Sequence, residues 1–541
     1  MGGTAVDRPP AQVAYFCMEY GLDDALPIYA GGLGVLAGDH LRAARDLGLP
    51  LVGIGILWRQ GYTHQVIGED GRPLDVYPPV PTDRLTDTGI RVRLRLRGRE
   101  VAVRAWYTEA FGNAPLYLLD TNLPENAYPD RRITDRLYGG TAEDRVLQET
   151  VLGVGGVRLL RALGLAPQVY HFNEGHAVLA GVELIREQLA EGRTFAEALA
   201  AVRSRVVFTT HTPVPAGNEV HRLELLEAVG ASAGLSRQQM AAIGGDPFGM
   251  TVAGLRLARI ANGVSALHGE TARQMWAGVE GAAPIIHITN GVHPGVFQDP
   301  RIRAAMAAGG DLWAAHMACK AELLQEVGRR TGHWLRPEVL TVGFARRAAP
   351  YKRPDLFFYD PDRAEALLRE GLVQLVFAGK AHPLDEAGKA MVTRLVEWAR
   401  RYPEQMVFLE NYSLGLGRIL TRGCDLWLNN PQRPLEASGT SGMKAAMNGV
   451  LNLSILDGWW AEACVHGVNG WGFGDGSPGP DQAARDAEAL HRVLLDEVIP
   501  TFYHRRPTWV AMMRESIAMA QDRFSAHRMV EEYRTQMYGL G

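Results

Sequence analysis

Short apolar and β-branched runs alternate with stretches of helical periodicity along most of the chain. Strands that alternate with helices are joined by crossover connections, so they form a parallel sheet. The pattern therefore predicts an α/β fold. The runs that we predict as strands are 13–18, 51–57, 206–210, 286–289, 340–344, 372–378, 406–409 and 425–428.

Polar or glycine-rich segments lie at the ends of several expected strands, and we call these segments tips. Three of them are the segments 171–176, 210–213 and 289–292. Ligands of open α/β sheets bind just beyond the carboxyl ends of the strands. We therefore expect the binding site to be built from these tips.

The length of 541 residues exceeds the roughly 250 to 300 residues at which single hydrophobic cores stop growing. A polar segment at 328–338, which contains Pro337, precedes the predicted strand at 340–344. We expect the domain boundary in this segment. The two domains would then cover residues 1–330 and 331–541.

The composition is that of an ordinary soluble protein, with 47% hydrophobic and 21% charged residues. No run of 18 apolar residues is present, so a membrane-spanning helix is not expected. The net charge is −4, from 56 basic and 60 acidic residues. That balance gives no general attraction to nucleic acid, so we expect neither a nucleic-acid nor a membrane partner.

The N-terminal segment 1–12 is polar and contains proline, and it lacks the basic start and apolar core of a secretory signal. The four cysteines lie far apart and form no CxxC pair, which indicates neither a disulfide framework nor a zinc site. We expect a cytoplasmic protein with reduced thiols and no metal. The cysteines are Cys17, Cys319, Cys424 and Cys464.

One stretch departs from the α/β alternation. Residues 91–97 alternate basic and apolar side chains, and an apolar run follows at 101–107. Two such runs across a short connection predict an antiparallel hairpin. Its arginines are most simply the solvated face of a strand.

The segment 436–444 places small and hydroxyl residues ahead of Lys444. Such a turn leaves backbone N–H groups free at the start of a helix, where the helix dipole favours an anion. A partly desolvated lysine one turn into that helix has a lowered pKa and can form a Schiff base with an aldehyde cofactor. A capped helix with a surface lysine is an equally good interpretation on physical grounds alone.

This segment, together with Asn448-Gly449 and 456–458, resembles the pyridoxal-phosphate site of the glycogen and α-glucan phosphorylase family. The resemblance implies that Lys444 carries pyridoxal 5'-phosphate. The residues that it assigns to the hydroxyls of the sugar are Glu436, Ala437, Ser438 and Gly439. Those that it assigns to the cofactor besides Lys444 are Gly32, Lys352, Tyr412, Thr440, Ser441 and Gly442.

The segment 346–353 holds four cations in eight residues after a predicted strand. This composition suits phosphate binding, although a solvated basic loop is the commoner outcome for a run of charge. In the family that the chain resembles, an arginine and a lysine five residues apart point at the two phosphates. Arg347 and Lys352 match them, while Pro350 stands where the family has an acidic residue.

A glycine loop, Gly31-Gly32-Leu33-Gly34, precedes a helical pattern at 36–47. The same residues fit part of a dinucleotide fingerprint, but no acid ends the next strand, so an anion-cradling loop is the better interpretation. Phosphorylases resemble this stretch closely, which implies that the loop amides face the phosphate and the sugar.

Two further tips carry histidines, at 173–176 and 210–212. A single histidine is more often a structural group than a catalyst. The resemblance implies that Glu174 and His176 line the sugar site. It places His211 where a main-chain carbonyl faces the anomeric carbon, so His211 orients the sugar and does not transfer a proton. Glu174-Gly175 resembles the bacterial branch of the family.

Further matches in the family's order extend from about residue 13 to 528–533, so the resemblance covers nearly the whole chain. It implies two Rossmann-like domains that face each other across a deep cleft, the GT-B glycosyltransferase architecture. The sugar-binding domain would be N-terminal and the cofactor domain C-terminal, with the last helix packing back on the first domain. Trp459 and Trp460 form either a sugar platform or part of the core, and we favour packing.

The activity that the resemblance implies is retaining phosphorolysis of terminal α-1,4-linked glucose, with an α-glucan and inorganic phosphate as partners. The catalytic groups would be Arg347, Lys352, His211 and Lys444. One alternative is a nucleotide-sugar glucosyltransferase of the glycogen synthase kind, which has no lysine-anchored cofactor. A second is an inactive glucan-binding protein. The sequence leaves the oligomeric state open, and a homodimer is one expectation.

Overall fold

Two sheets, one mostly and one entirely parallel, form the framework of the protein. The computed structural model describes residues 11–214 and 217–540. Within these residues the larger sheet has nine strands, and its two last pairings are antiparallel while the others are parallel. In sheet order its strands are β15 (Ile285–His287), β14 (Ile260–Gly263), β11 (Val206–Thr209), β10 (Val169–Asn173), β1 (Val13–Phe16), β4 (Leu51–Ile56), β9 (Leu116–Asp120), β8 (Arg99–Thr108) and β7 (Thr86–Leu96).

The second sheet has six strands in the described part of the chain, and all its pairings are parallel. Its order is β18 (Met406–Leu409), β17 (Val373–Ala378), β16 (Leu340–Ala345), β19 (Leu426–Asn429), β20 (Leu451–Ile455) and β21 (Gly470–Phe473). Three small two-stranded ribbons are β2 (Tyr20–Gly21) with β3 (Pro27–Ile28), β5 (His64–Ile67) with β6 (Pro73–Val76), and β12 (Val220–His221) with β13 (Phe248–Gly249).

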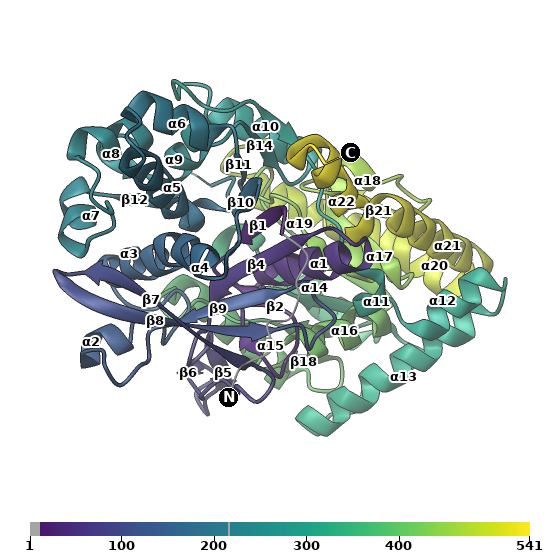
Figure 1. The fold of residues 1–541 in the computed structure, drawn as a ribbon. Helices are drawn as coiled ribbons and strands as arrows, with labels where there is room; N and C mark the ends of the chain where they lie inside the picture. The colour runs from purple at the N-terminus through teal and green to yellow at the C-terminus, as the bar shows by residue number, and fades with distance from the viewer. Residues whose placement is uncertain (1–10, 215–216, 541) are drawn as a thin grey trace.

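Helices connect the strands and cover both sheets (Figure 1). The first group is α1 (Gly32–Asp46), α2 (Tyr128–Arg131), α3 (Ala142–Thr150), α4 (Gly156–Ala162), α5 (Leu179–Ala190), α6 (Phe195–Arg203), α7 (Leu223–Val229), α8 (Arg237–Gly244), α9 (Met250–Leu257), α10 (Ala266–Met275) and α11 (Pro294–Phe297). The second is α12 (Pro300–Ala307), α13 (Leu312–Thr331), α14 (Pro361–Arg369), α15 (Glu386–Arg401), α16 (Leu414–Gly423), α17 (Thr440–Met447), α18 (Trp460–Ala463), α19 (Gln482–Val493), α20 (Ile499–His504), α21 (Arg506–Arg523) and α22 (Ala526–Glu532).

The predicted strands and the hairpin are confirmed. Each of the eight predicted runs overlaps an observed strand, and the errors are one or two residues at the ends. The hairpin is β7 and β8, and the alternating arginines of β7 at 91, 93 and 95 are exposed as predicted. Five strands of the two sheets had no predicted run, namely β9, β10, β14, β20 and β21. The last of these reads Gly470-Trp471-Gly472-Phe473, a composition more typical of a loop.

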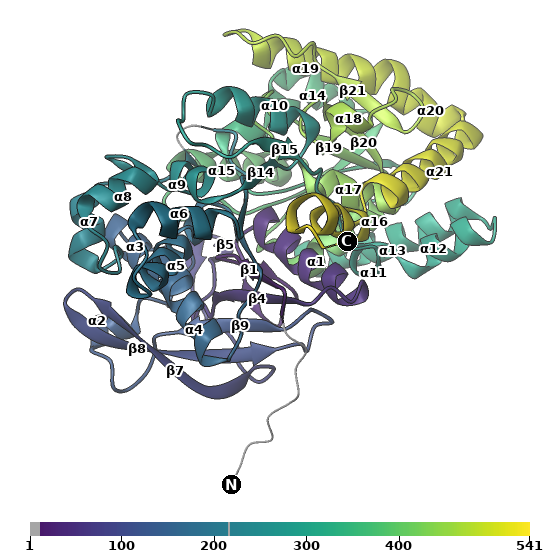
Figure 2. The ribbon, with the colours of Figure 1, turned by 45° about the horizontal axis from the view of Figure 1, so that its top comes forward.

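Each sheet has its own hydrophobic core. The core of the nine-stranded sheet takes side chains from β1, β4, β10 and the helices around them. The core of the six-stranded sheet takes side chains from β16, β17, β19 and β20, and also from α12 and α13. In Figure 2 the elements of the first half lie toward the lower left and those of the second half toward the upper right.

The C-terminal segment returns to the first core. Met529, Val530 and Tyr538 are fully or almost fully buried there, and α22 packs beside α1 (Figures 1 and 2). The Tyr538 hydroxyl lies 3.0 Å from His40 Nε2 and 2.8 Å from His171 Nδ1. The two ends of the described chain are thus joined in one packed region.

Trp459 and Trp460 pack in the core, as we predicted, because they are 2% and 0% exposed. The four cysteines are unpaired. The expected boundary segment 328–338 begins inside α13, which ends at Thr331 and is followed by Gly332 in the left-handed conformation, φ 74°. Across 11–214 and 217–540, no helix is both long and apolar enough to span a bilayer. Residues 1–10, most of the N-terminal segment in which no secretory signal is expected, lie outside the described residues.

Candidate active site

A cavity of about 760 Å³ lies where the carboxyl ends of the two sheets meet. Its wall includes Glu19 after β1, Glu174 after β10, Arg346 after β16 and Lys380 after β17. The strand order of each sheet reverses at its first strand, β1 or β16, which has parallel neighbours on both sides. Ligands of α/β sheets bind at such a switch point. The predicted site residues that line it are Gly31, Gly32, Leu33, Glu174, His176, His211, Arg347, Lys352, Tyr412, Glu436, Ala437, Ser438, Gly439, Thr440, Ser441 and Lys444.

Lys444 lies one turn into α17 and faces this cavity. Gly439, directly before the helix, has φ 95°, a conformation that strains other residues, so glycine permits the turn that starts α17 here. The Lys444 Nζ lies 4.4 Å from the centre of the Phe297 ring. Burial lowers the pKa of Lys444 to about 8. A useful fraction of this amine is therefore uncharged and nucleophilic near neutral pH.

The starts of α1 and α17 meet at the cavity wall. Gly31 and Gly32 begin the first helix, and Thr440 begins the second. A Cβ added to Gly32 would lie 3.9 Å from Thr440 Oγ1, and one added to Gly31 would meet no atom within 4 Å. The positive ends of two helix dipoles and their free N–H groups thus converge on open space. Such a place favours a phosphate or another anion.

The basic loop after β16 pairs with Glu436. Arg346 Nη2 lies 2.6 Å from Glu436 Oε2, and Lys352 Nζ lies 3.1 and 3.0 Å from its two carboxylate oxygens. Burial alone would raise the pKa of Glu436, but the two cations overcome this and lower it to about 2. Arg347 also lines the cavity. The resemblance named Arg347 and Lys352 but gave no role to Arg346, which makes the ion pair with Glu436.

Asp457 holds the backbone of Glu436 in place. Its Oδ2 accepts a hydrogen bond from Glu436 N at 2.9 Å, and its Oδ1 accepts one from Gly458 N at 2.8 Å. Burial raises the pKa of Asp457 to about 7, against the opposing effect of these donors. The carboxylate that faces the cavity therefore depends on a second, titratable carboxylate behind it.

Glu174 ties two strand tips together. One of its oxygens accepts hydrogen bonds from His211 N at 2.7 Å and from Thr212 Oγ1 at 3.1 Å. His211 in turn donates from Nε2 to Asn173 Oδ1 at 2.7 Å. Burial lowers the pKa of His211 to about 3, so its ring is neutral at physiological pH. A neutral, hydrogen-bonded ring suits an orienting role better than proton transfer.

His176 and Tyr412 are buried side chains of the same wall. His176 Nε2 accepts a hydrogen bond from Met18 N at 3.1 Å, and burial lowers the pKa of this histidine to about 3. Burial raises the pKa of Tyr412 to about 12, so its hydroxyl keeps its proton. Both side chains are therefore uncharged parts of the wall near neutral pH.

Two predicted residues, Gly34 and Gly442, do not line the cavity. A Cβ at Gly34 would lie 2.6 Å from Glu19 Oε2 and from Tyr29 Cβ. A Cβ at Gly442 would lie 2.6 Å from Asn452 Oδ1. These glycines allow close packing behind the helix starts, a role that the spacing of the motifs does not distinguish from ligand contact.

Several charged residues of the wall were not predicted from the sequence. Glu19 accepts hydrogen bonds from Ala30 N at 2.7 Å and Gly31 N at 3.2 Å, so it supports the glycine loop. Arg145 Nε donates to Glu219 at 2.9 Å, and burial lowers the pKa of Lys380 to about 8. Glu19 and Lys380 both follow strands directly, and that position was the signal available in the sequence.

This chain is similar to known proteins along nearly all of its length. The carbohydrate phosphorylase family profile matches residues 318–466, which include Arg347, Lys352 and the segment around Lys444. The maltodextrin phosphorylase of Thermococcus litoralis is 40% identical over 97% of this chain and 70% of its own length. The glycogen phosphorylase of Mycobacterium tuberculosis is 40% identical over 99% of this chain and 72% of its own.

A glycogen phosphorylase of Aquifex aeolicus is 36% identical over 97% of this chain and 86% of that protein. Matches of this extent involve both sheets and not only the segment around Lys444. The resemblance found in the sequence is thereby confirmed: the chain belongs to the carbohydrate phosphorylase family.

Proposed function

We propose that this enzyme is an α-glucan phosphorylase that depends on pyridoxal 5'-phosphate. It cleaves the terminal α-1,4-linked glucose of an α-glucan with inorganic phosphate and releases glucose 1-phosphate. The observation that supports this most directly is the cavity in which a lysine with lowered pKa, two helix starts and a basic loop converge. The names of the relatives support a glycogen or maltodextrin substrate.

The residues of the cavity fit the proposed cofactor. Lys444 supplies an amine that is partly uncharged near neutral pH, as attachment to an aldehyde requires. The open space beside Gly31 and Gly32, at the start of α1, leaves room for a phosphate group. Bound there, pyridoxal phosphate would supply a second phosphate group that exchanges charge and a proton with the substrate phosphate.

The cations and the helix starts would hold two anions at close range. Phosphates repel each other strongly when water is excluded, so positive groups must be fixed in advance. We assign this role to Arg347, Lys352 and the backbone amide of Gly32. Glu436 now neutralises Lys352, and in the complex we expect it to turn toward hydroxyls of the sugar.

The reaction exchanges one bond at the anomeric carbon for another. The substrate phosphate gives a proton to the glycosidic oxygen, the bond from this oxygen to C1 breaks, and a phosphate oxygen bonds to C1 from the same face. His211 and Glu174 would orient the sugar during the oxocarbenium-like transition state. No pair of catalytic carboxylates is needed, because phosphate is both acid and nucleophile.

We further propose the GT-B architecture, with two Rossmann-like domains facing each other across the cavity. The two cores and the cavity lined from both sheets support this division. Because Ile302 and Leu312 belong to the second core, we place the boundary before α12 and not at the expected residue 330. The contacts of Tyr538 with the first core support a last helix that returns to the N-terminal domain.

A cytoplasmic location belongs to the same proposal. The four unpaired cysteines support it, since thiols stay reduced in the cytosol. The proposed partners are the α-glucan and inorganic phosphate, and the proposed assembly is a homodimer, which light scattering on the purified protein tests.

The decisive experiment combines phosphorolysis with cofactor absorption. Purified protein with maltodextrin and phosphate should release glucose 1-phosphate and should show the visible absorption of bound pyridoxal phosphate. Lys444→Ala should lose both signals. Lys380→Ala is the matched control, since it removes another cavity lysine whose pKa is also lowered to about 8, and it should keep the absorption.

A colourless protein that stays inactive with added pyridoxal phosphate contradicts the proposal. Transfer of glucose from a sugar nucleotide by that colourless protein establishes the glycosyltransferase alternative.

A further inference from the structure

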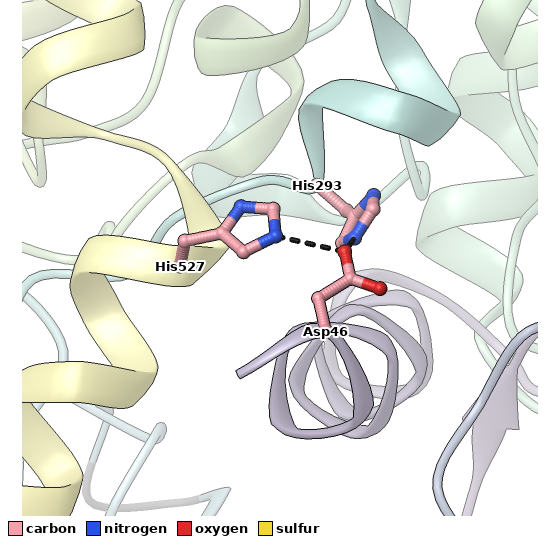
Figure 3. A group of neighbouring side chains, drawn as sticks. All are labelled: Asp46, His293 and His527. Atoms are coloured by element: carbon pink, nitrogen blue, oxygen red, sulfur yellow. Dashed lines mark hydrogen bonds and ion pairs between the residues drawn. The ribbon is translucent and has the colours of Figure 1, made fainter. Parts of the chain in front are cut away.

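Three side chains from distant parts of the sequence converge on a partly exposed place, and none of them lines the cavity. They are Asp46 at the end of α1, His293 before α11 and His527 in α22 (Figure 3). Asp46 Oδ2 lies 2.9 Å from His293 Nε2 and 2.8 Å from His527 Nε2. The two imidazole rings are 4.9 Å apart, centre to centre, and their planes are inclined at 46°. One carboxylate oxygen and two imidazole nitrogens therefore point into the same small space.

The backbone fixes the spacing of the two histidines. Val292 and Ser525 form a parallel bridge, in which Val292 N donates to Phe524 O at 2.9 Å and Ala526 N donates to Val292 O at 2.9 Å. His293 follows the first partner of this bridge directly, and His527 lies two residues after the second. The histidines are thus held near each other by main-chain hydrogen bonds and not only by their contacts with Asp46.

The surroundings suit a cation that enters from solvent. The Asp46 side chain is 46% exposed, that of His527 is 35% exposed and that of His293 is 10% exposed, so one side stays open for water ligands. Asp46 is the last residue of α1, where the negative end of the helix dipole opposes an acidic side chain. A cation at this place offsets both negative groups.

We propose that Asp46, His293 and His527 form a binding site for a divalent transition-metal ion, of which Zn²⁺ is the natural probe, with water completing the coordination. Two imidazoles and one carboxylate are a ligand set that such ions favour. The ion takes the place of the two Nε2–H contacts with Asp46. Each neutral imidazole then binds it through the lone pair of Nε2 and carries its one proton on Nδ1, so binding to neutral histidines releases no proton.

The geometry requires only a small opening of the group. Tetrahedral bonds of about 2.0 to 2.1 Å separate ligand atoms by roughly 3.3 Å. The observed separations of 2.8 and 2.9 Å are somewhat shorter, and rotation of the exposed Asp46 and His527 side chains supplies the difference.

A second group of potential ligands lies elsewhere, and it suits a metal less well. Glu149, Glu219 and His221 also lie close together, but Arg145 Nε is already 3.3 Å from Glu149 Oε1 and pairs with Glu219. A fixed guanidinium supplies the positive charge there and repels a metal ion. We therefore place the metal at Asp46, His293 and His527.

Equilibrium dialysis against Zn²⁺ with untagged protein tests the proposal. We expect one ion per chain at this site in the wild type. Because one of three protein ligands is lost, His527→Ala should bind at least about tenfold more weakly. His333→Ala is the control, since it removes an exposed histidine far from the group in sequence and should leave the affinity unchanged. The absorption spectrum of bound Co²⁺ reports the same ligands independently.

Asp46→Asn provides a second variant that keeps an acceptor for both histidines but is a poor metal ligand. It should fold as the wild type by circular dichroism and lose the Co²⁺ spectrum. Equal Zn²⁺ affinity in the wild type, His527→Ala and Asp46→Asn overturns the proposal, as does the absence of binding by the wild type. These measurements need neither glucan nor phosphate, so their outcome is independent of the proposed activity.

Discussion

The carboxylate of Glu436 has two roles, and the sequence indicates only one of them. The family resemblance assigns it to the sugar, and the structure shows that it also neutralises Arg346 and Lys352. Glu436→Gln should therefore destabilise the protein by about 3 kcal/mol, because it leaves buried cations without a partner. Urea denaturation measures this loss. In the double variant Arg346→Met/Glu436→Gln, the two losses should be less than additive. Strict additivity would contradict the ion pair.

Asp457 gives the stability of the protein a dependence on pH. Its pKa is raised to about 7 by burial, so between pH 4 and pH 7 the folded state keeps a proton that the unfolded state has lost. Stability from this group is therefore present at low pH and disappears as the pH rises toward 7. Asp457→Asn cannot titrate, and it should remove this part of the dependence.

The measurement is the free energy of unfolding of both proteins at several pH values. From pH 4 to pH 7 the wild type should lose up to about 4 kcal/mol relative to Asp457→Asn, at about 1.4 kcal/mol for each pKa unit. Because the other titrating groups are common to both proteins, the difference between their two free energies of unfolding reports the titration of Asp457. Parallel curves would show that its carboxyl has an ordinary pKa.

Among the structural elements, the contact between the loop 289–293 and α22 depends on the absence of a side chain at Gly291. A Cβ there would lie 2.3 Å from Ser525 O, which belongs to the bridge with Val292. Gly291→Ala should cost about 1 to 3 kcal/mol of stability, because the backbone has to move apart. Thermal unfolding checks this. Gly278→Ala is the control, since a Cβ at Gly278 meets no atom within 4 Å and should leave the melting temperature unchanged.

The sequence predicts elements best where the local pattern matches the final environment. Strands buried on both faces, such as β16 and β17, read as continuous apolar runs and were found. By contrast, β20 reads Leu-Asn-Leu-Ser-Ile, and its polar residues are buried through tertiary contacts that local sequence does not reveal. Asn452, for instance, donates to Gly442 O at 3.0 Å.

The prediction of site residues has the same limit, because the local sequence does not reveal contacts between distant parts of the chain. The motif around Lys444 lies within a few residues, so Lys444 could be named from the sequence as the lysine that we propose for the cofactor. The partners that set its environment come from elsewhere, such as Phe297 under the ammonium group and Glu19 behind the glycine loop. Contacts at long sequence separation have no local signature, and for this reason Arg346 was assigned no role.

At the scale of the whole molecule, contacts beside the cavity join the two halves. The carboxylate of Asp24 accepts hydrogen bonds from Leu414 N at 3.0 Å and Gly415 N at 2.9 Å, at the start of α16. Gln65 and Ala381 exchange two hydrogen bonds of 3.2 and 2.9 Å. The halves are therefore held together by directional contacts at several points around the site.

The C-terminal segment adds a further link, which the hydroxyl of Tyr538 makes testable. It bridges His40 and His171, both buried in the first core. Tyr538→Phe leaves two imidazole nitrogens without this partner, so it should lower the free energy of unfolding by about 1 to 3 kcal/mol. Tyr62→Phe makes the same chemical change where the buried hydroxyl has no hydrogen-bond partner among the described residues, and it should be neutral or slightly stabilising. Urea denaturation measures the free energy of unfolding of both variants. Equal losses of stability would mean that the returning segment is held by apolar packing alone.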